Sequence, residues 1–152
     1  MTAVEVSTPS PYVVDKVNAP VVKRGKAGGA LGLRAGILGV GVQVVSSEMG
    51  ETNLHSHPGT DSVWFVLDGE AEFYGTDDDV LIGRIGKNEG IAIPAGSPYW
   101  FKCSSEENLV IMHITARTPN YKEGASRKDY KPRDVGGENR IRDLVPGAFW
   151  QG

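Results

Sequence analysis

Two histidines one residue apart, His55 and His57, are the residues of this chain whose types and spacing most clearly indicate chemistry. Side chains at positions i and i+2 of a β-strand point to the same face, so two imidazoles spaced in this way converge on one point. A metal site requires such convergence. The chain contains three histidines in all, and this pair takes two of them. For the pair taken alone, the alternative is a chance spacing on a solvated strand.

A converging imidazole pair supports two kinds of chemistry. Imidazole nitrogens bind Zn, Fe, Ni, Cu or Mn, and the choice depends more on supply and geometry than on affinity. Water or substrate oxygens would fill the open positions on such an ion, which would then act as a Lewis acid or a redox centre. Without a metal, the same pair can act as acid and base, because imidazole titrates near neutrality.

The elements that must position this pair are short, regularly punctuated β-strands. Segments rich in β-branched and aromatic residues alternate with turns that contain Gly, Pro and Asp, and no segment shows helical periodicity over several turns. The dipeptide Asp68-Gly69 is a hairpin signal, so the strands on either side of it are expected to pair. The pattern predicts an all-β antiparallel sandwich or barrel. The expected strands are residues 36–45, 62–67, 70–74, 80–85, 90–93, 99–103 and 109–115.

Length and composition favour one soluble globular domain. The 152 residues are enough to bury a core, and 39% hydrophobic and 23% charged residues are ordinary values. A net charge of −3 gives no general attraction to nucleic acid or to an acidic membrane, and no apolar run reaches membrane-spanning length. The single cysteine, Cys103, and the lack of a secretory pattern at the N-terminus favour a cytoplasmic location.

The two ends of the chain differ from its centre, which divides the chain into three expected parts. Residues 1–29 are expected to form an arm or an added edge strand, residues 30–117 the β-barrel, and residues 118–152 a C-terminal extension. The extension ends in the apolar group 144–150, which an unstructured tail rarely carries. We therefore expect the extension to pack on the barrel or on a second subunit, and the chain to form a homodimer.

Around the histidine pair the sequence resembles the cupins. The first cupin motif combines a glycine, His-x-His, a glutamate and a glycine that closes a hairpin; it is matched by His55-Ser56-His57-Pro58 and by the run VWFVLDGE at 63–70. The second motif, Pro-x-Gly-x-x-His-x-x-x-Asn, is matched by PAGSPYWFKC at 94–103. The two motifs and their spacer cover residues 50–103. The resemblance implies a single-domain jelly-roll barrel with its site inside the barrel mouth.

The sequence departs from the cupin motifs at positions where the family has metal ligands. A typical cupin offers three histidines and one glutamate to the metal. Counted back from Gly69, the glutamate falls on Ser62, and the histidine of the second motif falls on Tyr99. The two motif histidines are kept, so any further ligands must come from elsewhere in the chain or from water.

Three residues are candidates to complete a metal site. Asp61, beside Ser62, could turn inward at a bulge, or it could cap the bend that precedes it. Tyr99 could ligate as a phenolate or hydrogen-bond a substrate, or it could line the barrel with its hydroxyl satisfied. His113, in the strand expected at 109–115, could face the cavity as a ligand, or it could be a partly buried histidine bonded to a neighbour.

Strand parity predicts the walls of the cavity. Trp64 and Val66 share parity with Ser62, and Phe101 shares parity with Tyr99. We expect these side chains to line a cavity suited to a flat or cyclic organic ligand. Ordinary packing in the core is the alternative.

The resemblance implies a site and leaves the reaction open, because cupins include dioxygenases, decarboxylases, isomerases, cyclases and dehydratases. We expect an enzyme that acts on a small organic molecule with a divalent transition metal (Zn, Fe, Ni or Mn), with His55, His57 and Tyr99 as its catalytic residues. A facial-triad oxygenase would need a carboxylate, for which Asp61 is the only local candidate. The alternatives are a non-catalytic module that binds a small ligand, and a metal-free cupin that uses histidine as acid and base.

Overall fold

The computed structural model describes residues 11–14, 27–47, 53–76, 80–124 and 127–131. For residues 27–31 it describes the backbone alone. Within these ranges the chain forms ten β-strands and no helix, so none of the described segments is a helix that could cross a membrane. The strands are β1 (Ala27–Ala35), β2 (Leu38–Val45), β3 (His55–Ser56), β4 (Thr60–Asp68), β5 (Glu70–Gly75), β6 (Leu81–Gly86), β7 (Gly90–Ile93), β8 (Tyr99–Cys103), β9 (Leu109–Arg117) and β10 (Lys128–Asp129).

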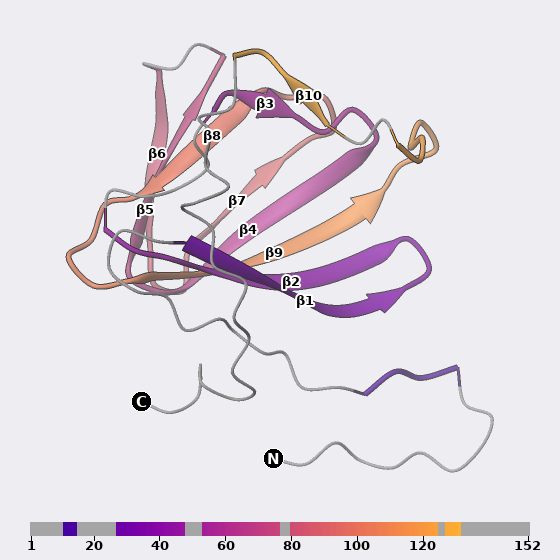
Figure 1. Cartoon of the computed structure of the whole chain (residues 1–152), viewed down its shortest axis with the longest axis horizontal. Helices are drawn as coiled ribbons and strands as arrows, with labels where there is room; N and C mark the ends of the chain where they lie inside the picture. Colours follow the sequence, from indigo (N-terminus) through magenta and orange to yellow (C-terminus); the bar gives the residue numbers. More distant parts are fainter. Residues whose placement is uncertain (1–10, 15–26, 48–52, 77–79, 125–126, 132–152) are drawn as a thin grey trace.

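The described strands form two antiparallel five-stranded sheets. The first has the order β1-β2-β9-β4-β7 and the second the order β10-β3-β8-β5-β6. In Figure 1 the first sheet fills the lower right of the molecule and the second the upper left, with the interior between them. This architecture confirms the all-β antiparallel sandwich or barrel that the sequence predicts.

The core lies between the two sheets because the strands alternate in burial with period two. In β8, for example, Tyr99, Phe101 and Cys103 are buried, whereas Trp100 and Lys102 face outward. The interior cluster also contains residues of β2, β4, β5, β6, β7 and β9. It comprises Val45, Trp64, Val66, Ala71, Phe73, Ile85, Ile93, Tyr99, Phe101, Cys103, Leu109 and Ile111.

The turn at Asp68-Gly69 is a corner between the sheets, so the expected hairpin is wrong. β4 pairs with β7 and β9, whereas β5 pairs with β6 and β8. Gly69 adopts a φ of 80°, and a Cβ at this position would lie 2.8 Å from the carbonyl oxygen of Asn108. The glycine is therefore needed for a sharp change of direction, and that change carries the chain into the other sheet.

Two strands lie near the ends of the described chain. β1 pairs with β2 at the edge of the first sheet, and β10 pairs with β3, with Lys128 opposite Ser56 and Asp129 opposite His55. The chain after β9 thus returns to β3, the strand that carries His55 (Figure 1). The apolar group 144–150 lies outside the described residues, and the three-part division of the chain stays a prediction.

Candidate functional site

The two histidines of the His-x-His motif lie side by side on the interior side of the second sheet. Their ring centroids are 5.1 Å apart and their planes cross at 84°. Both rings contact Tyr99, with centroid distances of 4.6 Å from His55 and 6.3 Å from His57. Because Tyr99 points into the core, both rings lie on the interior side, but only His55 is on β3 and buried, whereas His57 follows the strand and is half-buried.

His55 is held in a defined orientation by a backbone carbonyl. Its side chain is buried, with 1% of its surface exposed, and its Nδ1 lies 2.9 Å from the carbonyl oxygen of Asn53. A carbonyl oxygen only accepts hydrogen bonds, so this contact assigns the proton of the neutral imidazole to Nδ1. The lone pair is then on Nε2. Metal-binding histidines commonly donate the other ring N–H to a carbonyl or carboxylate in this way.

Tyr99 occupies the position at which the cupin motif has a histidine, and its hydroxyl is engaged inside the barrel. The indole Nε1 of Trp64 donates a hydrogen bond to the Tyr99 hydroxyl oxygen at 3.2 Å. Both side chains are almost fully buried. The structure therefore places the Tyr99 phenol next to the two imidazoles, and Trp64 on β4 holds its hydroxyl.

Ser62 occupies the position of the cupin glutamate, and it faces the interior. Only 4% of its surface is exposed, and its Oγ forms a hydrogen bond of 3.0 Å with Nε2 of His113. His113 also stacks on Trp64, with ring centroids 3.7 Å apart. His113 thus contacts a serine and an indole, and a role as metal ligand stays a prediction.

Asp61 points to the outside of β4, opposite to Ser62. Its side chain is exposed, and its Oδ1 accepts a hydrogen bond of 2.7 Å from the backbone N–H of Ala95. The register shift of the β4–β9 pair lies between Val66 and Asp68, so no bulge turns Asp61 inward. This placement corrects the expectation that Asp61 could bring a carboxylate to the histidine pair, because adjacent residues of a strand face opposite sides.

The expected wall residues have the contacts of core residues. Val66 and Phe101 are fully buried, and Phe101 packs 4.9 Å from Trp64 and 4.9 Å from Phe73, measured between ring centroids. These contacts match the alternative of ordinary core packing. Contact of these side chains with a ligand stays a prediction.

The spacing of the two imidazoles agrees with that of two ligands on one metal ion. With metal–nitrogen bonds of about 2.1 Å and angles of roughly 90–110°, two imidazoles on one ion have ring centres about 5 Å apart. The separation of 5.1 Å in this chain agrees with that value. Among the residues that the structure describes, however, no three His, Cys, Asp or Glu side chains gather to hold an ion. Further ligands would be hydroxyl, water or substrate oxygens.

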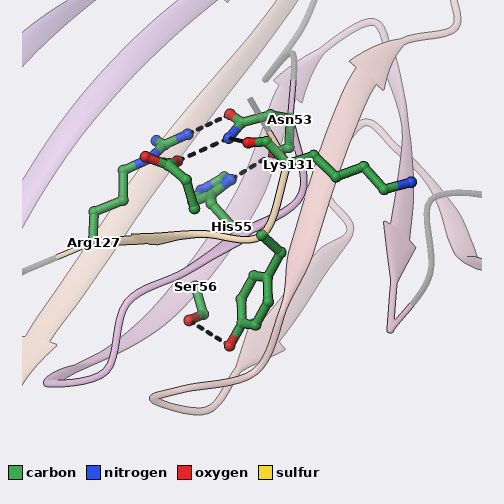
Figure 2. Close-up of polar contacts among 7 residues, drawn as sticks. Asn53, His55, Ser56, Arg127 and Lys131 are labelled. Atoms are coloured by element: carbon green, nitrogen blue, oxygen red, sulfur yellow. Dashed lines mark hydrogen bonds and ion pairs between the residues drawn. The ribbon is translucent and has the colours of Figure 1, made fainter. Parts of the chain in front are cut away.

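Two residues of this site could not be found from the sequence patterns. Asn53 supports His55 through its carbonyl, and its side chain contacts Arg127, which is 74 positions away in the chain (Figure 2). Asn53 lies just before the His-x-His motif, but no local pattern links it to a residue so distant. The pairing of β10 with β3 brings the two together.

Comparisons with known proteins agree with this geometry. Residues 43–115 match the cupin domain family. An uncharacterized conserved protein with a double-stranded β-helix domain from Klebsiella pneumoniae superposes with a TM-score of 0.60 at 17% identity, over 84% of this chain and 100% of that one. A cupin superfamily protein from Desulfitobacterium hafniense superposes with a TM-score of 0.53 at 13% identity, over 64% and 84%. Residues 43–115 are therefore similar to a cupin domain, and the chain has the jelly-roll fold of these solved structures.

Curated relatives match a shorter stretch. Acireductone dioxygenase from Enterobacter sp. (strain 638) is 40% identical over 63 residues, which are 41% of this chain and 34% of that protein. The enzyme of the same name from Citrobacter koseri is 38% identical over 63 residues. The match therefore spans about a third of the length of these relatives.

Proposed function

We propose that His55 and His57 bind one divalent transition metal ion, and that the chain is a metal-dependent cupin enzyme that acts on a small organic molecule inside the barrel. The observation that carries this proposal is the pair of interior imidazoles 5.1 Å apart, of which one has its Nδ1 proton held by the Asn53 carbonyl. The local similarity to acireductone dioxygenases supports an enzyme of this type.

In this proposal Nε2 of His55 and an imidazole nitrogen of His57 hold the ion. The Tyr99 ring lies beside both imidazoles, and in this proposal its hydroxyl contacts the ion or a bound substrate. When bound, a metal of the Zn, Fe, Ni or Mn group supplies Lewis-acid or redox chemistry. The residues of the chain orient the ligands, and the buried aromatic surroundings keep bulk water away.

The ligand set favours Lewis-acid chemistry over a facial-triad oxygenase. Such a triad needs two histidines and a carboxylate. Within the described part of the chain no carboxylate joins the histidine pair, and Asp61 faces outward. An isomerase, cyclase or lyase reaction, in which a substrate oxygen is polarised, therefore agrees better with this site than dioxygen chemistry does.

A second candidate function is supported by Ser62 and Tyr99. These two hydroxyls stand where a cupin has two of its metal ligands, and their hydrogen bonds go to His113 and Trp64. The same interior could thus bind a small ligand without metal, through hydroxyl and imidazole groups. The histidine pair would then serve as acid and base, or as a hydrogen-bonding wall.

Metal titration separates the two candidates. Tag-free protein stripped with a chelator is titrated with Zn, Mn, Ni and anaerobic ferrous iron in a calorimeter. We expect one ion per chain for the wild type and no stoichiometric binding for the double variant His55→Ala, His57→Ala. The exposed carboxylate Glu106 provides a control, since Glu106→Gln reports binding to surface acids and should leave the interior site unchanged. Wild-type protein that binds none of these ions would exclude the metal proposal and favour the metal-free one.

A further inference from the structure

The residues that hold Asn53 come from outside the stretch that matches the cupin domain. The segment 127–131 lies beyond residues 43–115, and its strand β10 covers the edge of the second sheet at β3. On its other side β3 pairs with β8 only through His55 and Tyr99. The segment 127–131 thus contributes much of the backbone pairing around His55, and just beyond the two strands the Tyr130 N–H donates a hydrogen bond of 3.0 Å to the Leu54 carbonyl.

The side chain of Asn53 is buried and its hydrogen-bonding capacity is filled by this segment. Only 5% of Asn53 is exposed. Its Nδ2 donates to Oδ1 of Asp129 at 2.8 Å and to the carbonyl oxygen of Lys131 at 3.1 Å, and its Oδ1 accepts from Nη2 of Arg127 at 2.6 Å. Both amide protons and the amide oxygen therefore have partners, which also determines the orientation of the amide group.

Arg127 donates hydrogen bonds to both Asp129 and Asn53. Its Nε donates to Oδ1 of Asp129 at 2.8 Å while its Nη2 reaches Oδ1 of Asn53. One planar guanidinium makes both contacts at once, which a lysine ammonium on a flexible stem cannot reproduce with the same geometry. Figure 2 shows the Arg127 side chain and the backbone carbonyl of Lys131 at the Asn53 side chain, with His55 below it and the Lys131 side chain pointing away.

We propose that Asn53 and Arg127 are positioning residues for His55: the 127–131 segment clamps the Asn53 side chain, and the Asn53 carbonyl thereby holds the proton of His55 on Nδ1. The inference rests on the proposed function, because it gives Nε2 of His55 the role of ligand. It goes beyond the cupin motifs, since its main residue lies 74 positions from Asn53 and outside the matched domain. Partners of this kind typically change metal affinity by about 10–100-fold when removed.

Nitrogen-15 NMR of the histidine rings in the metal-free protein tests the clamp directly. The wild type should show His55 with its proton on Nδ1. In Arg127→Gln we expect a mixture of the two tautomers and a Kd for metal raised about tenfold or more. The matched control is Lys87→Gln, which removes the same charge from an exposed residue between β6 and β7, outside the 127–131 segment, and should change neither quantity.

A second pair of variants covers the case in which Arg127→Gln does not fold. Arg127→Lys keeps the charge and should show the same tautomer shift in a smaller degree. Asn53→Asp keeps the size and the acceptor but loses the Nδ2 donors, so its carboxylate would oppose Asp129 and loosen the clamp. Circular dichroism confirms that each variant compared is folded.

The outcomes separate this inference from the proposed function. An unchanged His55 tautomer in folded Arg127 and Asn53 variants overturns the inference, as does an equal shift in Lys87→Gln. If the wild type binds no metal, the proposed function fails, and the tautomer measurement still decides whether the segment positions His55.

Discussion

Trp64 and His113 stack face to face across the β4–β9 pair, with ring centroids 3.7 Å apart and planes 5° from parallel. The same indole donates its N–H to Tyr99, which in turn contacts His55. Trp64 therefore connects the hydrogen-bonded pair of His113 and Ser62, through Tyr99, to the imidazole of His55 on β3. His113 has, in these contacts, a structural role that requires no metal.

The variant His113→Gln should separate a structural from a ligating role. Loss of the stack and of the hydrogen bond to Ser62 should lower the free energy of unfolding by about 1–3 kcal/mol. Metal affinity should stay close to that of the wild type. Urea unfolding and calorimetric titration measure the two effects. An affinity loss as large as that of His55→Ala would instead make His113 a ligand.

Restoring the cupin ligands should tighten metal binding. Ser62 is buried and faces the interior, and the Tyr99 ring lies against both histidines, so Ser62→Glu with Tyr99→His adds donors on strands that already face the site. We expect the Kd to fall at least tenfold, which corresponds to about 1.4 kcal/mol. The metal-free variant should be less stable, because it buries a carboxylate. Ser62→Gln is the control, because glutamine has the size of glutamate without its charge. If the variant with Ser62→Glu binds the ion no more tightly than the variant with Ser62→Gln, position 62 does not face the ion.

Removing the Tyr99 hydroxyl should weaken the interior network. In Tyr99→Phe the buried Nε1 of Trp64 loses its acceptor, and the free energy of unfolding should fall by about 1–3 kcal/mol. A double-mutant cycle with Trp64→Phe isolates the contact, since removal of either partner ends the same hydrogen bond. Strictly additive effects of the two substitutions would contradict the contact.

Glu72 should make stability depend on pH on the acid side. The hydrogen bond from the Tyr74 hydroxyl, at 2.5 Å, is the main cause that holds the pKa of this carboxyl below its ordinary value, and Arg84 and Lys102 act in the same direction. A lowered pKa stabilises the fold above the ordinary carboxyl pKa, and this contribution is lost as pH falls through the lowered one. In Glu72→Gln the acid-side decline in melting temperature should become shallower, whereas the exposed control Glu106→Gln should retain the wild-type slope.

The hydrogen bond between Tyr74 and Glu72 should also make the stability of the fold depend on pH in the alkaline range. The carboxylate of Glu72 raises the pKa of the Tyr74 phenol, chiefly through this hydrogen bond. The contribution of Tyr74 is therefore complete below the ordinary phenol pKa and is lost as pH rises through the raised one. Melting curves of Tyr74→Phe should show a smaller loss of stability in this alkaline range, and an unchanged profile would contradict the assignment.

Deleting residues from Asp143 onward should affect assembly or stability. This prediction rests on sequence alone, since the apolar group 144–150 lies outside the described residues. Such a group is costly to leave in water, so we expect it to pack, in a homodimer interface or on the barrel. The truncated chain should have a lower oligomer mass by light scattering or a lower melting temperature. A truncation without effect on either would show the group to be dispensable.

The sequence by itself determined most of the strands, although β1, β3 and β10 were not among those expected. The segments 90–93 and 99–103 are strands β7 and β8 at the predicted bounds. These strands follow from a period-two alternation that is local and can be counted along the chain. The rings of His55 and His57 do lie side by side, but β3 ends at Ser56, so strand periodicity alone does not place His57.

Only the tertiary structure decided which strands pair and which distant residues meet. Gly69 marks a turn in the sequence, but whether β5 continues in the same sheet depends on its pairing with β6 and β8. The orientation of Asp61 depends on the register of β4, because a shift of one residue exchanges the two faces. The contact of Arg127 with Asn53 joins positions 74 apart and has no local signal. It exists because β10 pairs with β3, and that pairing is a property of the folded chain as a whole.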